Sequence, residues 1–147
     1  MNRSEQLLQL AGRDIELDCT DYQGLQRLMH ALYEQLLVRS SAQIESLNQQ
    51  ISVLVEFIRS RAERRRKILS AFGVSTATPG AMKQLLARCP LPNRAELIQC
   101  WDELEQLVQT SKAINERNGK LLAMHNDILG QIIGRAQSAQ VYAPRYY

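Results

Sequence analysis

Hydrophobic residues recur along this chain at the spacing of α-helices. The clearest stripe alternates in steps of three and four: Ile44, Leu47, Ile51, Leu54 and Ile58. An earlier leucine stripe has helical spacing in a different phase: Leu25, Leu28, Leu32 and Leu36. Such spacing places each set on one face of a helix and is typical of helices that pack lengthwise. The phase changes near Ser40-Ser41, where we expect a kink, a stutter or a helix break.

Proline divides the chain into two helical regions and a connector. The four prolines are Pro79, Pro90, Pro92 and Pro144. Proline lacks the backbone N–H and clashes with the preceding turn, so helix interiors exclude it. The two long proline-free stretches therefore predict two helical arms flanking a short segment.

Capping signals set the expected limits of the first arm. Thr20 with Gln23 forms a capping-box pattern that predicts a helix start there, so the first arm should cover residues 20–73. Gly73 follows a basic last turn and suits the left-handed position after a helix. Residues 1–19 are expected to form a separate N-terminal segment, with a short helix over residues 4–11 stopped by Gly12.

The connector is expected to cover residues 74–93 and to contain a short helix. Thr78 followed by Pro79 predicts an N-cap and a proline in the first helical position, with the helix running roughly from Gly80 to Arg88.

A second capping box, Asn93 with Glu96, predicts the start of a last helix over residues 94–137. Its apolar face is wide, and one row recurs at intervals of seven: Cys100, Leu107, Ile114, Leu121 and Ile128. Gly119, Gly130 and Gly134 weaken the end of this helix, each by about 1 kcal/mol against alanine. Residues 138–147 have no helical period, and we expect a mobile tail.

These elements predict one all-α domain over residues 1–147, an elongated antiparallel bundle of long helices with a short connector helix. The 147 residues are 45% hydrophobic and 22% charged, as in ordinary globular proteins. The sequence contains no run of about 18 apolar residues, so it predicts no membrane span. The start of the chain lacks the apolar core of a signal peptide, so we expect a cytoplasmic protein.

Catalytic and metal-binding motifs are absent from the sequence. His30 and His125 are far apart, and no nucleophile elbow, zinc motif or phosphate-binding loop occurs. The three cysteines have no CxxC spacing, which argues against a disulfide framework or a zinc site. The early carboxylates, from Asp14 to Asp21, lack the spacing of a cation loop and suggest a solvated acidic stretch. We expect no enzyme activity, no metal and no cofactor.

The run from Arg59 to Lys67 contains six basic residues and is the strongest charge feature. One interpretation is phosphate binding, which makes a basic coiled-coil nucleic-acid-binding or scaffold protein the alternative function. The other is a solvated helix face that compensates the helix dipole. Arg61 and Arg65 fall on the hydrophobic seam, where their stems can cover the core while their charged ends reach solvent.

Small polar residues on the last helix suggest a binding groove. Ser111, Asn115 and Asn118 lie on or beside its apolar face. Asparagines there could fix the register of an incoming helix, and the leucine-rich face would supply affinity. The alternative is a locally weakened helix that faces solvent.

The same segment resembles a known family. Asn115-Glu116-Arg117-Asn118-Gly119-Lys120-Leu121-Leu122 is similar to the N-x-x-N-G-x-L-[LI] signature of the FlgN family of flagellar export chaperones. The basic-then-leucine segment Arg65–Gly73 and Trp101 also resemble that family. The resemblance implies a cytosolic, non-enzymatic chaperone of flagellar type III export. Such a chaperone binds the C-terminal helical segments of the hook–filament junction proteins FlgK and FlgL, prevents their premature assembly and delivers them to the export gate.

The resemblance also implies client-binding residues, at the positions that match its signature: Asn115, Asn118, Gly119, Leu121 and Leu122. The apolar period extends this face to four further positions: Ile114, Ile128, Leu129 and Ile132. The family uses an exposed tyrosine near a terminus for gate docking, and Tyr142 is the candidate, although Ala143-Pro144 stands where the family often has glycine. The apolar stripe itself could be a client groove, intramolecular core or a dimer seam, so the oligomeric state stays open.

Overall fold

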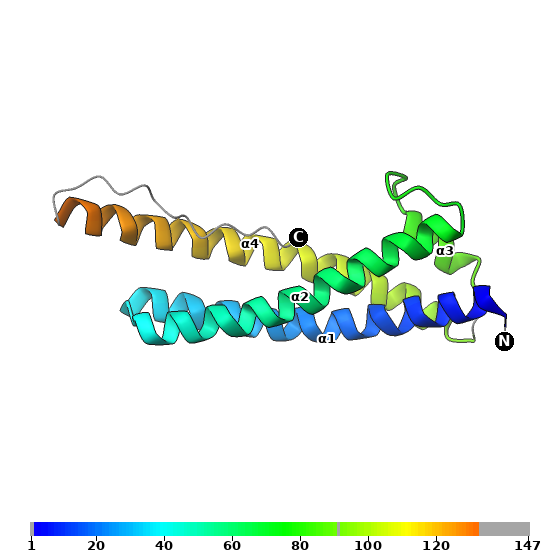
Figure 1. The fold of residues 1–147 in the computed structure, drawn as a ribbon, viewed down its shortest axis with the longest axis horizontal. Helices are drawn as coiled ribbons and strands as arrows, with labels where there is room; N and C mark the ends of the chain where they lie inside the picture. Colours follow the sequence, from blue (N-terminus) through cyan, green and yellow to red (C-terminus); the bar gives the residue numbers. More distant parts are fainter. Residues whose placement is uncertain (1, 91, 133–147) are drawn as a thin grey trace. The chain divides into compact units, whose positions relative to one another are not determined.

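The computed structural model describes residues 2–90 and 92–132, and it describes side chains up to Ile128. Four helices make up the described chain (Figure 1): α1 (Arg3–Val38), α2 (Ser41–Ala71), α3 (Ala81–Ala87) and α4 (Arg94–Ile132). The predicted all-α fold, with long antiparallel helices and a short connector helix, is confirmed. None of the described helices is long and apolar enough to cross a membrane.

The first helix is longer than the sequence predicted. α1 runs without interruption through Gly12 and Thr20, so the predicted stop and the predicted capping box were both wrong. The Thr20 hydroxyl donates to the Glu16 carbonyl oxygen at 3.3 Å within the helix. A Cβ built on Gly12 would lie 3.0 Å from Leu97 Cδ1, so this glycine permits close packing of α4. Burial of Ala11 and Ile15 favours continuing the helix through a weak local sequence.

The α1–α2 break falls where the hydrophobic phase changes. The Ser40 N–H donates to the Gln35 oxygen at 3.2 Å and the Arg39 N–H to the Leu36 oxygen at 3.3 Å. These two bonds form a Schellman motif, in which the residue after the cap is left-handed. Arg39 takes that position with φ 57°.

α2 ends in the same motif, but with glycine in the left-handed position. The Val74 N–H donates to the Leu69 oxygen at 2.9 Å and the Gly73 N–H to the Ser70 oxygen at 3.0 Å. Gly73 has φ 72°. The expected role of Gly73 is therefore confirmed.

The connector helix is present, but its predicted cap was wrong. α3 starts at Ala81, and its N-cap is Gly80 with φ 69° and no side-chain cap hydrogen bond. Thr78 and Pro79 lie in the preceding turn, where the Thr78 oxygen accepts the Ala81 N–H at 3.1 Å. Gly80 adopts the left-handed conformation that this tight turn requires, and burial of the α3 side chains stabilises the helix. α4 begins at Arg94, directly after the predicted Asn93 cap.

The chain divides into two compact units, and α1, α2 and α4 each continue from one unit into the other. Unit 1 contains residues 1–23 and 56–107, with a core built around Ile15, Leu86 and Leu97. Unit 2 contains residues 24–55 and the chain from 108 onward. Three residues of the predicted leucine stripe are in its core, whereas Leu28 is half-buried. Met29 and residues of α2 and α4 join these three in the core: Leu25, Met29, Leu32, Leu36, Ile51, Val55 and Ile114.

Candidate functional site

The asparagine segment of α4 lies in unit 2 and packs against α1. Ile114, Asn115, Asn118 and Gly119 are all buried. The Asn118 side-chain amide donates to the Met29 carbonyl oxygen at 2.8 Å. This bond joins α4 to α1, so these four predicted client-binding residues belong to the interior of unit 2 in this structure.

A polar row continues along this interface. Ser111 is fully buried, and its hydroxyl accepts a hydrogen bond from the Gln26 side chain at 3.3 Å. Both side-chain amide atoms of Asn115 and the Asn118 Oδ1 are buried without a hydrogen-bond partner among the described residues. An unsatisfied buried polar atom costs roughly 1–3 kcal/mol. The α1–α4 contact in unit 2 is therefore specific in register but weaker than an apolar contact of the same size.

The other predicted client-binding residues lie nearer the surface. Leu121, Leu122 and Ile128 are half-buried. The side chains of Leu129 and Ile132 lie outside the described residues, as does all of Tyr142. Of the described group, Leu122 lines an open groove.

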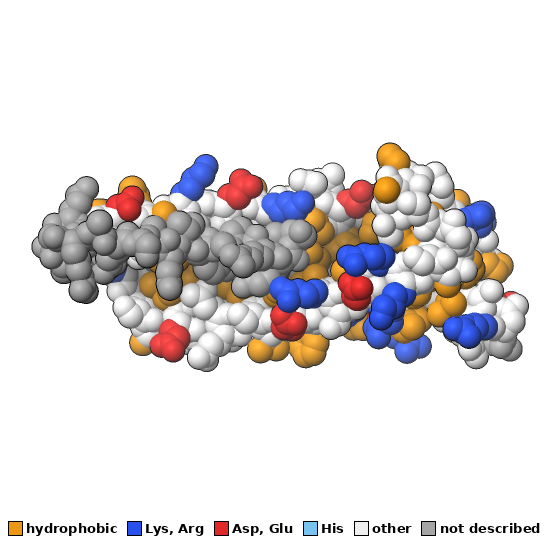
Figure 2. Space-filling model, turned by 45° about the horizontal axis from the view of Figure 1, so that its top comes forward, with side chains coloured by type: hydrophobic (Ala, Val, Ile, Leu, Met, Phe, Trp, Pro, Cys, Tyr) orange, Lys and Arg blue, Asp and Glu red, His pale blue; other side chains and the backbone are white. Residues whose placement is uncertain are grey.

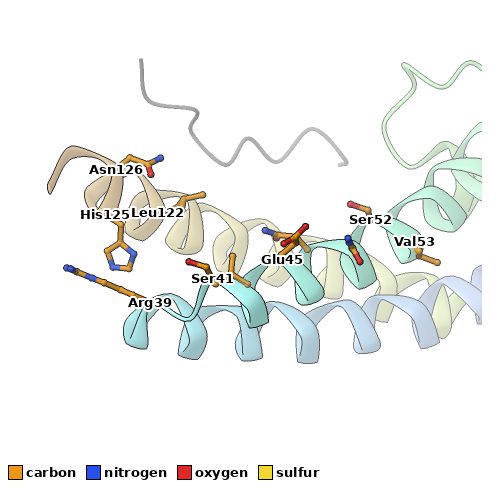
Figure 3. Close-up of a pocket in the computed structure, with 11 residues that line it drawn as sticks. Arg39, Ser41, Glu45, Ser52, Val53, Leu122, His125 and Asn126 are labelled. Atoms are coloured by element: carbon orange, nitrogen blue, oxygen red, sulfur yellow. The ribbon is translucent and has the colours of Figure 1, made fainter. Parts of the chain in front are cut away.

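That groove has a volume of about 950 Å³ and lies between α2 and the last part of α4 (Figure 3). Ile44, Val53 and Leu122 supply its aliphatic surface. The remaining lining is polar: Arg39, Ser41, Glu45, Asn48, Gln49, Ser52, His125 and Asn126. An open groove that combines aliphatic side chains with hydrogen-bonding groups suits an amphipathic helix.

Charged groups are distributed unevenly along the groove. Figure 3 shows Arg39 and His125 together at one end, Glu45 farther along α2 and Val53 at the opposite end. Burial and the positive charge of Arg39 lower the pKa of His125 below its ordinary value of 6.5. Sequence reasoning placed a break near Arg39 but did not identify Arg39, Glu45 or His125 as groove residues. The period of an apolar stripe carries no information about which polar residues flank a groove.

The basic run and the early carboxylates are partners of one another in unit 1. The Arg64 guanidinium binds Asp14 through two hydrogen bonds of 2.7 Å. Arg61 donates to Asp18 at 2.8 Å and to Asp21 at 2.7 Å, and Arg65 donates to Asp18 at 2.8 Å.

This network corrects two expectations from the sequence. Asp14 and Asp18 are 1% and 0% exposed, so they do not form a solvated acidic stretch. The charged ends of Arg61 and Arg65 do not extend freely into solvent but bind carboxylates, and Arg65 also lies over the Trp101 ring at 5.2 Å. On the face drawn in Figure 2, acidic side chains likewise lie among the basic ones. Three of the arginines proposed for phosphate binding are thus neutralised within the chain.

The helices and the groove define an all-α protein with an open polypeptide-sized groove. Residues 4–142 match the family described as FlgN protein, so the chain belongs to the FlgN family. The predicted family resemblance is confirmed. Membership implies the role of a flagellar export chaperone, which is not an enzymatic role. Among the described residues, no group of three or more His, Cys, Asp or Glu side chains could hold a metal ion.

One solved structure supports the fold. A crystal structure from Pseudomonas aeruginosa, described as a candidate flagella synthesis protein FlgN, is similar with a TM-score of 0.66. The match covers 91% of this chain and 98% of that chain, at 23% sequence identity. No curated protein matches the chain.

Proposed function

We propose that this protein is a cytoplasmic chaperone that binds the C-terminal helical segments of FlgK- and FlgL-like hook–filament junction proteins. It prevents their premature assembly and delivers them to the export gate. Family membership supports the chaperone role. The observation that carries the binding mode is the open groove between α2 and α4 in unit 2.

The groove suits a reversible complex with an amphipathic helix. Ile44, Val53 and Leu122 would contact the apolar face of the client, and the serine and amide side chains around them would bind its polar edge. Val53 is 56% exposed, which leaves apolar surface for a partner to cover. Such a surface gains affinity from burial and needs no chemical step for release.

The predicted client-binding residues then divide into two groups. Leu121, Leu122 and Ile128 form the accessible part, and Leu129 and Ile132 would extend it along the same helix. The assignment of Ile114, Asn115, Asn118 and Gly119 stays a prediction. It requires α4 to move away from α1, and the unpaired amide atoms at this contact lower the cost of that movement. Gate docking through Tyr142 also stays a proposal.

Calorimetric titration with the C-terminal helical segment of the cognate FlgK-like protein tests the proposal. We expect binding with a negative heat-capacity change and little dependence on salt. Val53→Asp should weaken binding by at least about tenfold, because it places a charge in the apolar part of the groove. Met124→Asp is the matched control, since Met124 is 53% exposed on α4 but does not line the groove.

The outcome also distinguishes the alternative function. Phosphate binding through Arg59–Lys67 should fall steeply, by a factor on the order of a thousand or more between about 50 and 200 mM salt if six phosphates are contacted. No binding of the peptide, together with steeply salt-dependent binding of duplex DNA, would replace the chaperone proposal with the nucleic-acid alternative. Equal loss of peptide binding in Val53→Asp and Met124→Asp would reject the groove as the site.

A further inference from the structure

Arg39 stands at a backbone position where an arginine is unfavourable. It has φ 57° in the left-handed region, which costs an ordinary L-residue roughly 1–2 kcal/mol. The equivalent position at the end of α2 is occupied by Gly73, which has φ 72° without that cost. The helix end therefore does not require an arginine. Strained residues of this kind are enriched at binding sites.

The side chain of Arg39 is available for binding. Arg39 is exposed and lines the groove, and its guanidinium has no hydrogen-bond or ion-pair partner among the described residues. Figure 3 shows the His125 imidazole directed toward it. The positive charge of Arg39 disfavours protonation of the adjacent His125, and an anion bound between the two groups would remove that penalty.

We infer that Arg39 and His125 bind the C-terminal α-carboxylate of the docked client helix. The inference rests on the proposed function, because the client segment is the C-terminal end of a chain and so carries that carboxylate. A guanidinium binds a carboxylate through two parallel hydrogen bonds, and a neutral imidazole can donate one more. The last carbonyl groups of a helix are also unpaired and carry partial negative charge, which strengthens the attraction.

This contact fixes the direction of the client in the groove. α2 begins at Ser41, beside Arg39, and its groove residues continue to Val53. A client whose C-terminus lies at Arg39 therefore runs antiparallel to α2. The opposite direction would place the negative end of the client near Val53, where none of the described lining residues is basic, and would leave Arg39 without a carboxylate, so the charges of the groove favour the first direction.

The test compares two synthetic peptides of the cognate FlgK-like C-terminal segment, one with a free terminal carboxylate and one amidated. Wild-type protein should bind the free-carboxylate peptide about tenfold more tightly, as expected for a charge-assisted hydrogen-bonded contact. Arg39→Gly should lose most of this preference and bind the free-carboxylate peptide nearly as weakly as the amidated one, because only the single imidazole hydrogen bond remains. Arg39→Lys should retain part of the preference, because it keeps the charge but loses the two-pronged geometry.

Arg39→Gly is a safe variant for this purpose, because glycine suits the left-handed backbone at residue 39 and folding is not at risk. If wild-type protein binds both peptides equally, the inference is wrong while the proposed function stands. A carboxylate preference that survives in both Arg39→Gly and His125→Gln would place the carboxylate elsewhere and overturn the assignment. Failure of wild-type protein to bind either peptide would overturn the proposed function and the inference together.

Discussion

Asp18 shows how a single side chain connects two helices of unit 1. It is fully buried and accepts hydrogen bonds from both Arg61 and Arg65. These two arginine side chains are 12% and 14% exposed, so each depends on its carboxylate partners for compensation. Breaking a buried pair is costly because a buried charge then remains unpaired.

Asp18→Ala should therefore lower the free energy of unfolding by about 3–5 kcal/mol. Urea denaturation followed by circular dichroism measures the effect. The matched control is Glu63→Ala, which removes a pair with Arg66 whose side chains are 52% and 59% exposed. That control should cost less than about 1 kcal/mol. Equal effects of the two variants would mean that the Asp18 network is not a stabilising centre.

Arg39 and Gly73 allow a reciprocal test of backbone strain. Arg39→Gly should raise the free energy of unfolding by up to about 1 kcal/mol, because it removes the left-handed penalty at φ 57°. Gly73→Ala should lower it by about 1 kcal/mol, because it introduces that penalty at φ 72°. Chemical denaturation of both variants measures the pair. A destabilised Arg39→Gly would show that the arginine side chain stabilises the turn.

Cys19 is buried in unit 1, and its sulfur donates to the Cys100 carbonyl oxygen at 3.4 Å. Burial, the Cys100 thiol and nearby carboxylates raise the pKa of Cys19 from 9.0 to about 11. At about pH 8 the thiolate fraction is then about a hundredfold smaller than for an ordinary thiol. Because only the thiolate is nucleophilic, alkylation of Cys19 should be slowed to a similar extent.

Iodoacetamide at about pH 8 should accordingly leave Cys19 unmodified in the folded protein and modify it in denaturant, as read by mass spectrometry of its peptide. The rate should rise with pH up to a value near 11. Rapid modification of Cys19 in the folded protein at neutral pH would contradict its burial and raised pKa.

The helices themselves could be predicted more reliably than their ends. The heptad and leucine stripes are local features, and they correctly indicated helices over the regions of α1, α2 and α4. The Gly73 terminus and the Arg94 start were also predictable, because the signals lie within one turn of the boundary. The stop at Gly12 failed because the reason for that glycine is Leu97, more than eighty residues away.

Substitution by alanine should have different effects on stability at two glycines inside α1. A Cβ on Gly24 would lie 3.6 Å from Leu54 Cδ1, an ordinary contact, so Gly24→Ala should stabilise the protein by about 1 kcal/mol through helix propensity. A Cβ on Gly12 would lie 3.0 and 3.2 Å from the two Leu97 methyl groups. Gly12→Ala should therefore gain less or lose stability, because Leu97 must shift.

Thermal denaturation of the two alanine variants measures this difference. Introducing Leu97→Val into Gly12→Ala is a further control, since the shorter side chain leaves room for the new methyl group and should remove part of the strain. Equal stabilisation by Gly12→Ala and Gly24→Ala would show that Leu97 adjusts without cost.

At the scale of the whole molecule, the sequence did not predict which helix faces pack against one another. Asp14, Asp18 and Asp21 pair with arginines 40 to 50 residues later, and the sequence offered no register for that pairing. The same limit applied to the site: the period of α4 marked its apolar face but could not separate the part that packs on α1 from the part that borders the groove. Family resemblance supplied the functional class, and the structure supplied the division within the helix.

That division predicts unequal stability along α4. Residues 94–107 belong to unit 1, and residues 108–128 belong to unit 2, where Asn115 and Asn118 have buried amide atoms without partners and Gly119 weakens the helix. Amide hydrogens of 108–128 should exchange faster than those of 94–107, because their opening costs less free energy.

Asn115→Leu tests the cause, because it replaces an unpaired buried amide with an apolar side chain of similar size. It should stabilise this part of α4 by about 1–2 kcal/mol and slow its exchange by roughly five- to thirtyfold if exchange occurs through local opening. Asn118→Leu is the contrasting variant, because it also removes the hydrogen bond to Met29 and should gain less. If exchange is uniform along α4 and unchanged in Asn115→Leu, the unpaired amides do not weaken the helix. Movement of this segment to admit a client would then lack an energetic basis, while the groove beside Leu122 would remain available without such movement.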